Sequence, residues 1–166
     1  MNVLRDRRFR LAGVTAVVVL VADQVTKTIV QQTMTQHESI PLAPFLAFTY
    51  VRNPGAAFGL LAGLGDAIRL PLLVVVTCVA LWVLFSFLRE APPERGLLVC
   101  AIGGVLGGAL GNLVCRVRYG EVVDFVHLHW RGFDWPMFNV ADAAITVGVT
   151  VILAYSLLAP PPRPSR

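Results

Sequence analysis

Two aspartates, Asp124 and Asp142, could carry out shared acid–base chemistry, because they flank a short loop between two apolar stretches with few other charges nearby. An aspartate at the centre of a membrane span costs about 2.5 to 3.5 kcal/mol, so an acid close to hydrocarbon is a candidate functional group by default. Two neighbouring carboxyl groups share one proton because their negative charges repel. One can then take a proton from water while the other polarises a carbonyl group, as peptide hydrolysis by a carboxyl pair requires.

Asp142 also has a purely structural interpretation. Asn139 precedes it by three residues, which is the spacing of a helix N-cap with an acid in the first turn. A cap alone, however, needs no second acid nearby. His127 and His129 lie on one face of a predicted strand, but no third ligand follows at a suitable spacing, so we expect no metal and no cofactor.

Polar residues on two other apolar stretches could support the aspartates. In the third stretch Asn112 and Arg116 continue an i+4 row of glycines and point towards the end where the aspartates should lie. The glycines of this stretch, which fall in two rows, are Gly103, Gly104, Gly107, Gly108 and Gly111. They are typical of close helix packing. In the first stretch Asp23 and Lys27 form an i,i+4 pair, which is either a self-neutralising ion pair or part of the site.

Composition indicates an integral membrane protein, because 56% of the 166 residues are hydrophobic, 14% are charged and the mean hydropathy is +0.70. We expect one membrane-embedded domain over residues 1–166, with spans at about 11–30, 69–88, 96–116 and 137–159. Asp66 is the expected N-cap of the second span and Pro71 is expected in its first turn. A cleaved secretory signal over residues 1–22 is the alternative interpretation of the first span.

Charge distribution predicts the orientation of the spans. Eight of the 14 basic residues lie in the termini and the middle loop, and the other six are spread over the two longer loops. The positive-inside rule then places both termini in the cytoplasm and both longer loops, with the aspartates, outside. The net charge of +4 belongs to this pattern and does not indicate nucleic-acid binding.

The two outer loops each contain a strand-like run, at Phe45 to Val51 and at Val122 to Trp130. We expect an all-α membrane protein of four transmembrane helices, with these runs pairing into a small extracytoplasmic β-sheet that holds Asp124 on rigid backbone. Trp130 and Trp135 are typical of the interfacial aromatic belt. The three cysteines, Cys78, Cys100 and Cys115, fall in predicted spans and are expected to be buried and free.

Five blocks of sequence together resemble one known family. They are Asp23 to Lys27, Arg52 to Gly59, Gly107 to Leu113 with Arg116, Val122 to Phe125, and Phe138 to Asp142. In this order, over roughly residues 20–150, they closely resemble lipoprotein signal peptidase (signal peptidase II), a family of four-helix aspartyl proteases of the bacterial inner membrane. One departure is Cys115, which stands where the family usually has an acid before the motif arginine.

The resemblance implies that Asp124 and Asp142 are the catalytic pair. It also implies a supporting role for the other motif positions, which are Asp23, Lys27, Asn53, Gly55, Asn112, Arg116 and Asn139. The implied partners are membrane lipid and prolipoproteins whose signal peptide ends just before a diacylglyceryl cysteine, and we expect a monomer. The glycine face of the third span is expected to leave room for the substrate's signal helix. A small proton-coupled transporter and a structural membrane subunit are the alternatives.

Overall fold

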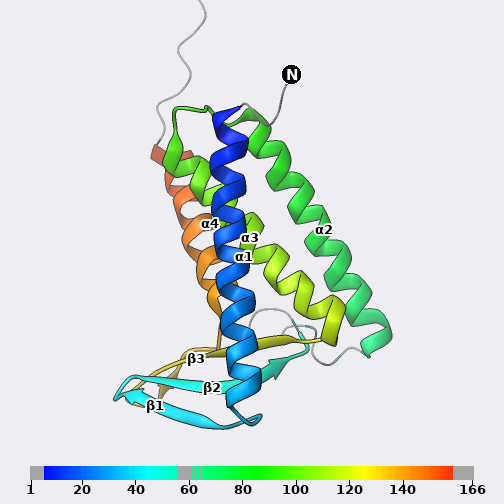
Figure 1. Cartoon of the computed structure of the whole chain (residues 1–166), viewed down its shortest axis with the longest axis vertical. Helices are drawn as coiled ribbons and strands as arrows, with labels where there is room; N and C mark the ends of the chain where they lie inside the picture. Colours follow the sequence, from blue (N-terminus) through cyan, green and yellow to red (C-terminus); the bar gives the residue numbers. More distant parts are fainter. Residues whose placement is uncertain (1–5, 56–60, 62, 64, 159–166) are drawn as a thin grey trace, which may run out of the picture.

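This computed structural model describes residues 6–55, 61, 63 and 65–158. Within them the chain forms four long helices and one antiparallel sheet, which lies across the ends of the helices far from the N-terminus (Figure 1). In chain order the elements are α1 (Arg7–Thr33), β1 (Ser39–Ala43), β2 (Leu46–Asn53), α2 (Asp66–Glu90), α3 (Gly96–Tyr119), β3 (Val122–Trp130), β4 (Phe133–Asp134) and α4 (Val140–Leu158).

All four helices are long and apolar enough to cross a membrane, which confirms the four predicted spans. Their outer faces carry exposed apolar side chains such as Val17, Val75 and Leu153, which suit contact with lipid. The predicted start of the second span was wrong in two details. Gly65 and not Asp66 is the N-cap of α2, and Pro71 lies beyond the first turn, since the helix begins at Asp66.

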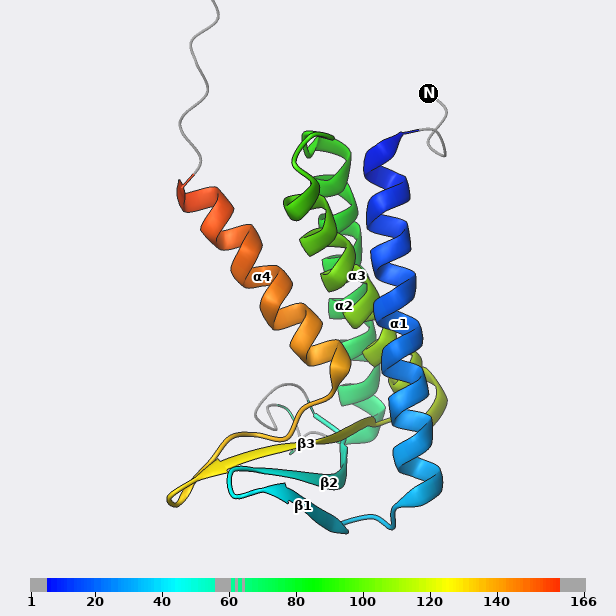
Figure 2. The same ribbon diagram turned by 60° about the vertical axis from the view of Figure 1, so that its left-hand side comes forward.

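Helix α3 packs closely against α1 and α4 through its glycines (Figure 2). A Cβ atom added at Gly107 would lie 2.4 Å from the backbone oxygen of Ala16 in α1, and one added at Gly108 would lie 2.5 Å from that of Ala141 in α4. The helix-packing interpretation of the glycines is therefore confirmed. The expectation that this face leaves room for a substrate helix was wrong, because α1 and α4 fill it.

The sheet has the order β1-β2-β3-β4 and contains both predicted strands together with the short outer strands β1 and β4. It packs on the end of α1, where Val30 and Met34 contact Tyr50, Val123 and Phe125. In the β2–β3 pair, Val51 lies opposite Asp124 and Asn53 lies opposite Val122. Because alternate residues share one face of a strand, Asn53 and Asp124 meet on the same side of the sheet.

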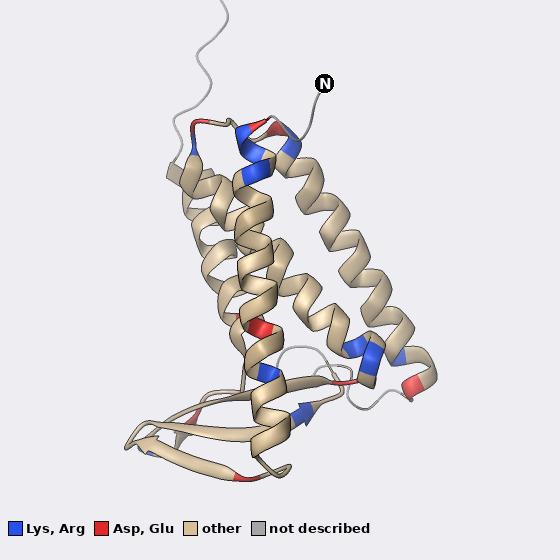
Figure 3. Ribbon diagram, in the orientation of Figure 1, with Lys and Arg blue, Asp and Glu red and all other residues tan. Residues whose placement is uncertain are grey.

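Charged residues gather at the two ends of the helices, and their long middle parts are nearly free of charge (Figure 3). At the end near the N-terminus, the Arg8 guanidinium donates to the backbone oxygens of Arg89 and Ala91, which ties α1 to the end of α2. The cysteines lie in α2 and α3 as predicted and are free. Cys115 is buried, but Cys78 is exposed on the outer face of α2, so burial was wrongly predicted there.

Candidate active site

Asp124 lies on β3 and is almost fully buried, with 2% of its surface exposed. Two amide groups hold its carboxyl oxygens. Asn53 Nδ2 donates to one at 3.0 Å, and Asn139 Nδ2 donates to the other at 2.6 Å. Burial, and then the charge of Asp142, raise the pKa of Asp124 to about 6. This carboxyl group can therefore keep a proton at a pH where an exposed aspartate is fully ionised.

Asp142 lies in the first turn of α4, and its carboxylate is part of the helix cap. The backbone N–H of Asn139 donates to Asp142 at 3.2 Å, and the backbone N–H of Asp142 donates to the Asn139 side chain at 3.0 Å. This reciprocal pair confirms the predicted capping arrangement. The cap is not the whole role, because Asn112 Nδ2 of α3 also donates to Asp142, at 2.8 Å.

Asn139 is the residue that contacts both aspartates, and it is completely buried. Its backbone N–H reaches Asp142, and its side chain reaches Asp124. The chain before it is held in place because Phe138 forms an antiparallel bridge with Val126 of β3. One short segment therefore fixes the start of α4 against the strand that carries Asp124.

A buried ion pair on α1 connects to the same group of residues. Lys27 Nζ lies 2.9 Å from the carboxylate of Asp23 and donates to Asn112 Oδ1 at 2.8 Å. Asp23 also accepts the backbone N–H of Ala141 in the first turn of α4, at 3.0 Å. Asp23 and Lys27 therefore form the predicted ion pair, and they also contact the residues around the aspartates.

Arg116 projects from the end of α3 towards the turn after β2. Its Nη2 donates to the backbone oxygen of Gly55 at 3.2 Å, and the Gly55 N–H donates to the Asn53 side chain at 3.0 Å. Arg116 Nε is buried and has no hydrogen-bond partner among the described residues. The rest of this sequence motif, residues 56–59, lies outside the described residues.

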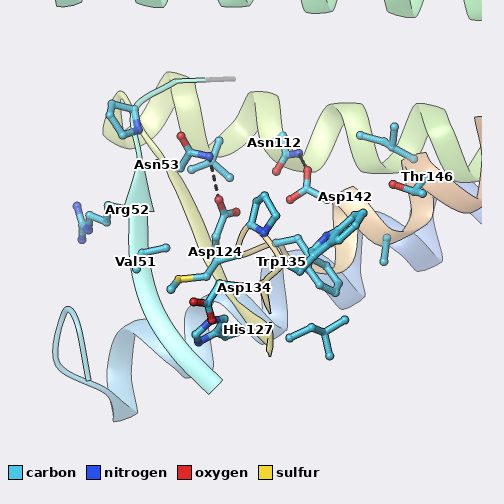
Figure 4. A pocket seen from close by; sticks show the side chains of 18 of the residues that line it. Val51, Arg52, Asn53, Asn112, Asp124, His127, Asp134, Trp135, Asp142 and Thr146 are labelled. Carbon is cyan, nitrogen blue, oxygen red and sulfur yellow. Dashed lines mark hydrogen bonds and ion pairs between the residues drawn. The ribbon is translucent and has the colours of Figure 1, made fainter. Parts of the chain in front are cut away.

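A cavity of about 1070 Å³ opens beside the aspartates and is lined by both of them (Figure 4). Most of its other lining residues were not singled out from the sequence as site residues, among them Trp135, Pro136, Phe138, Ile145 and Thr146. Ile145 and Thr146 follow Asp142 by three and four residues, so helical spacing alone could have identified them. The irregular segment before α4 gave no such signal. Asp23 and Lys27 are not among the lining residues.

His127 also lines the cavity, and its Nε2 lies 3.2 Å from the carboxylate of Asp134. Over the part of the chain that the structure describes, no three histidine, cysteine or acidic side chains are grouped so that they could hold a metal ion. The cavity thus brings the carboxyl groups of Asp124 and Asp142, which can transfer protons, together with amide donors and the guanidinium group of Arg116.

Comparisons with known proteins agree with this geometry. Residues 15–158 match the family model of signal peptidase (SPase) II. The lipoprotein signal peptidase of Syntrophotalea carbinolica is 46% identical over 88% of this chain and 90% of its own length, and that of Geobacter sulfurreducens is 45% identical over 80% and 82%. A solved bacterial membrane enzyme has a TM-score of 0.81 at 35% identity and covers 93% of both chains. The chain belongs to the signal peptidase II family.

Proposed function

We propose that this protein is an aspartyl endopeptidase that removes the signal peptide from prolipoproteins, with Asp124 and Asp142 as its catalytic residues. The family and the relatives, which are lipoprotein signal peptidases, support the proteolytic activity. The observation that carries the catalytic type is that two buried carboxyl groups from different elements line one cavity. One carboxylate takes a proton from water, and the other group, as a carboxylic acid, polarises the scissile carbonyl. The raised pKa of Asp124, about 6, suits it to hold that proton.

The substrate that we propose ends its signal peptide just before a cysteine that carries a diacylglyceryl group. The cavity wall beside the aspartates is largely apolar, and its members include Met137, Phe138, Ile145 and Val147. Lipid chains contribute roughly 0.8 kcal/mol for each buried CH₂ group, so they would hold the substrate in the membrane and fix the depth of its cysteine. We expect lipidated precursor to be cleaved far faster than the same precursor with an unmodified cysteine, and equal rates at matched concentrations would contradict this selection.

The protein is a multi-pass bacterial membrane protein. We place it in the cytoplasmic membrane, with both termini in the cytoplasm and the cavity on the extracytoplasmic side, since eight of the 14 basic residues of the sequence lie in its termini and middle loop. One chain supplies all the residues of the site, which supports a monomer. We assign no metal or cofactor to the reaction, so EDTA should leave activity unchanged, and zinc-dependent recovery after EDTA would overturn this assignment.

The catalytic pair is tested by changing each acid to its amide. Asp124→Asn and Asp142→Asn should each abolish cleavage of a lipidated precursor by the purified protein in detergent micelles, because a single carboxyl group cannot act as base and acid together. Asp6→Asn, an identical change at the opposite end of α1, is the control and should retain activity. Full activity in either of the first two variants, with normal folding by circular dichroism, would exclude this mechanism.

A further inference from the structure

The three asparagine side chains that donate to the aspartates share one property. In each of them the side-chain oxygen accepts a hydrogen bond from a group that can only donate. For Asn139 this group is the backbone N–H of Asp142, and for Asn53 it is the backbone N–H of Gly55. For Asn112 it is the ammonium group of Lys27.

A neighbouring group that can only donate hydrogen bonds determines which end of a side-chain amide faces it. A carboxamide has an acceptor at one end and two donors at the other, whereas an ammonium group has no acceptor. With Lys27 on its oxygen, Asn112 must turn its NH₂ group to Asp142, where it donates at 2.8 Å. Asn139 and Asn53 are fixed by backbone groups, whereas the Asn112 oxygen accepts from two side chains. Lys27 is the nearer and the charged donor, at 2.8 Å, and the Asn139 NH₂ group lies at 3.3 Å.

Stability alone does not explain this lysine. Lys27 and Asp23 have 2% and no exposed surface respectively, and replacing a buried ion pair by apolar residues is often neutral or stabilising. Yet here the ammonium group is shared between the Asp23 carboxylate and the Asn112 amide. Asn112, which accepts the second of these contacts, in turn donates a hydrogen bond to Asp142.

Building on the function proposed above, we propose that Lys27 is a positioning residue that locks the Asn112 amide with its NH₂ group on Asp142 and so favours the ionised form of Asp142. A protonated Asp142 would need an acceptor on its Asn112 side, and the lock withholds one. The other charged or titratable groups around the pair, among the described residues, are Asp23 on α1, Arg52 on β2, Arg116 on α3, His127 on β3 and Asp134 on β4.

The test compares Lys27→Gln with Lys27→Arg in the purified, full-length enzyme. Glutamine can donate or accept, so the Asn112 amide keeps only the longer hydrogen bond from Asn139 and its orientation is less firmly fixed. Arginine can only donate, so the lock is kept. We expect Lys27→Gln to lower kcat/KM by about 10- to 100-fold near neutral pH, and the acid limb of its pH profile to move up by about one pH unit. Lys27→Arg should recover the position of the acid limb.

A double variant, Asp23→Asn with Lys27→Gln, controls for misfolding. The single variant Lys27→Gln leaves the Asp23 carboxylate buried without its partner, whereas the double variant leaves no unpaired buried charge. It should show the same moved acid limb as Lys27→Gln with a thermal unfolding temperature nearer that of the unmodified enzyme. The proposal is overturned if the glutamine variants fold and keep the original pH profile, or if Lys27→Arg has the profile of Lys27→Gln. The Asp124→Asn and Asp142→Asn variants are assayed alongside. Cleavage by either of these would overturn the proposed function itself. If both are inactive and the pH profile of Lys27→Gln is unchanged, only the role of Lys27 is overturned.

Discussion

Helices α2 and α3 are nearly equal in length, 25 and 24 residues, and both are apolar enough to span a membrane, yet they occupy opposite environments. Most of the apolar window of α3 is buried, whereas very little of that of α2 is. The difference lies in residue size. Glycines let the backbones of α1 and α4 approach α3, while α2 presents valine, leucine and phenylalanine outwards. Small residues, and not overall hydropathy, thus identify the helix that packs inside the bundle and supplies Asn112 and Arg116 to the site.

The largest difference between the two helices is expected in how much an arginine of each contributes to kcat/KM. Arg116→Ala should lower kcat/KM by about 10²- to 10³-fold, because its positive charge faces both aspartates and its Nε has no partner among the described residues. Arg89→Ala, in the last turn of α2, should leave cleavage unchanged. Steady-state kinetics on lipidated precursor would measure both. Equal activities would show that the end of α3 takes no part in the reaction.

The same cysteine change should have opposite outcomes in the two helices. Cys78→Asp puts a charge on the outer face of α2 near its middle, which costs about 2.5 to 3.5 kcal/mol, so insertion and yield should fall sharply. Cys115→Asp should be tolerated, because it restores the family's usual residue beside Gln24, whose amide lies 3.8 Å from the Cys115 sulfur. Yield and activity in membranes measure both effects. Loss of activity in a well-folded Cys115→Asp protein would mean that Arg116 is held differently here.

Glycine substitutions test how closely α3 packs against α1. Gly107→Ala should lower the free energy of unfolding by about 1 to 3 kcal/mol, since its Cβ would lie 2.4 Å from the Ala16 oxygen. Gly13→Ala is the matched control on α1, where nothing lies within 4 Å, and its gain in helix propensity should raise stability by up to about 1 kcal/mol. Thermal unfolding in micelles would compare them. Equal unfolding temperatures would argue against close contact between α1 and α3.

A further effect lies outside both helices and concerns the pH dependence of stability. Because burial raises the pKa of Asp124 from 3.8 to about 6, the folded protein binds this proton more tightly than the unfolded chain does. The stabilising contribution is fully present below pH 3.8 and is lost as the pH rises through about 6. The unfolding temperature of the unmodified protein should therefore fall relative to Asp124→Asn between pH 4 and pH 7. A constant difference would mean that Asp124 is not desolvated.

Much of the fold followed from local patterns in the sequence. Apolar length predicts the spans, and β-branched and aromatic runs predict β2 and β3. Strand β1 was missed because Pro41 weakens a strand prediction, although proline is tolerated at the edge of a sheet, which is where β1 lies. Strand β4 has only two residues and gives no periodic signal.

The site was predictable where its residues follow helical spacing and less so where helices meet. The i+4 row leading to Asn112, and the cap formed by Asn139 and Asp142, can be read from the sequence. The contact between Lys27 and Asn112 cannot, since it depends on how closely α1 and α3 approach. Gly111 permits that approach, because a Cβ there would lie 2.5 Å from an oxygen of Asp23, and only the folded chain reveals this.

The start of α4 shares its hydrogen bonds with the site. The N–H groups of its first turn are held by Asp23 and Asn139, so this turn cannot fray without loosening the residues around Asp124 and Asp142. Amide hydrogens at Ala141 and Asp142 should consequently exchange with solvent only in openings that also disassemble the catalytic centre. Their exchange rates therefore measure how often, in the enzyme without substrate, the residues around Asp124 and Asp142 are not assembled.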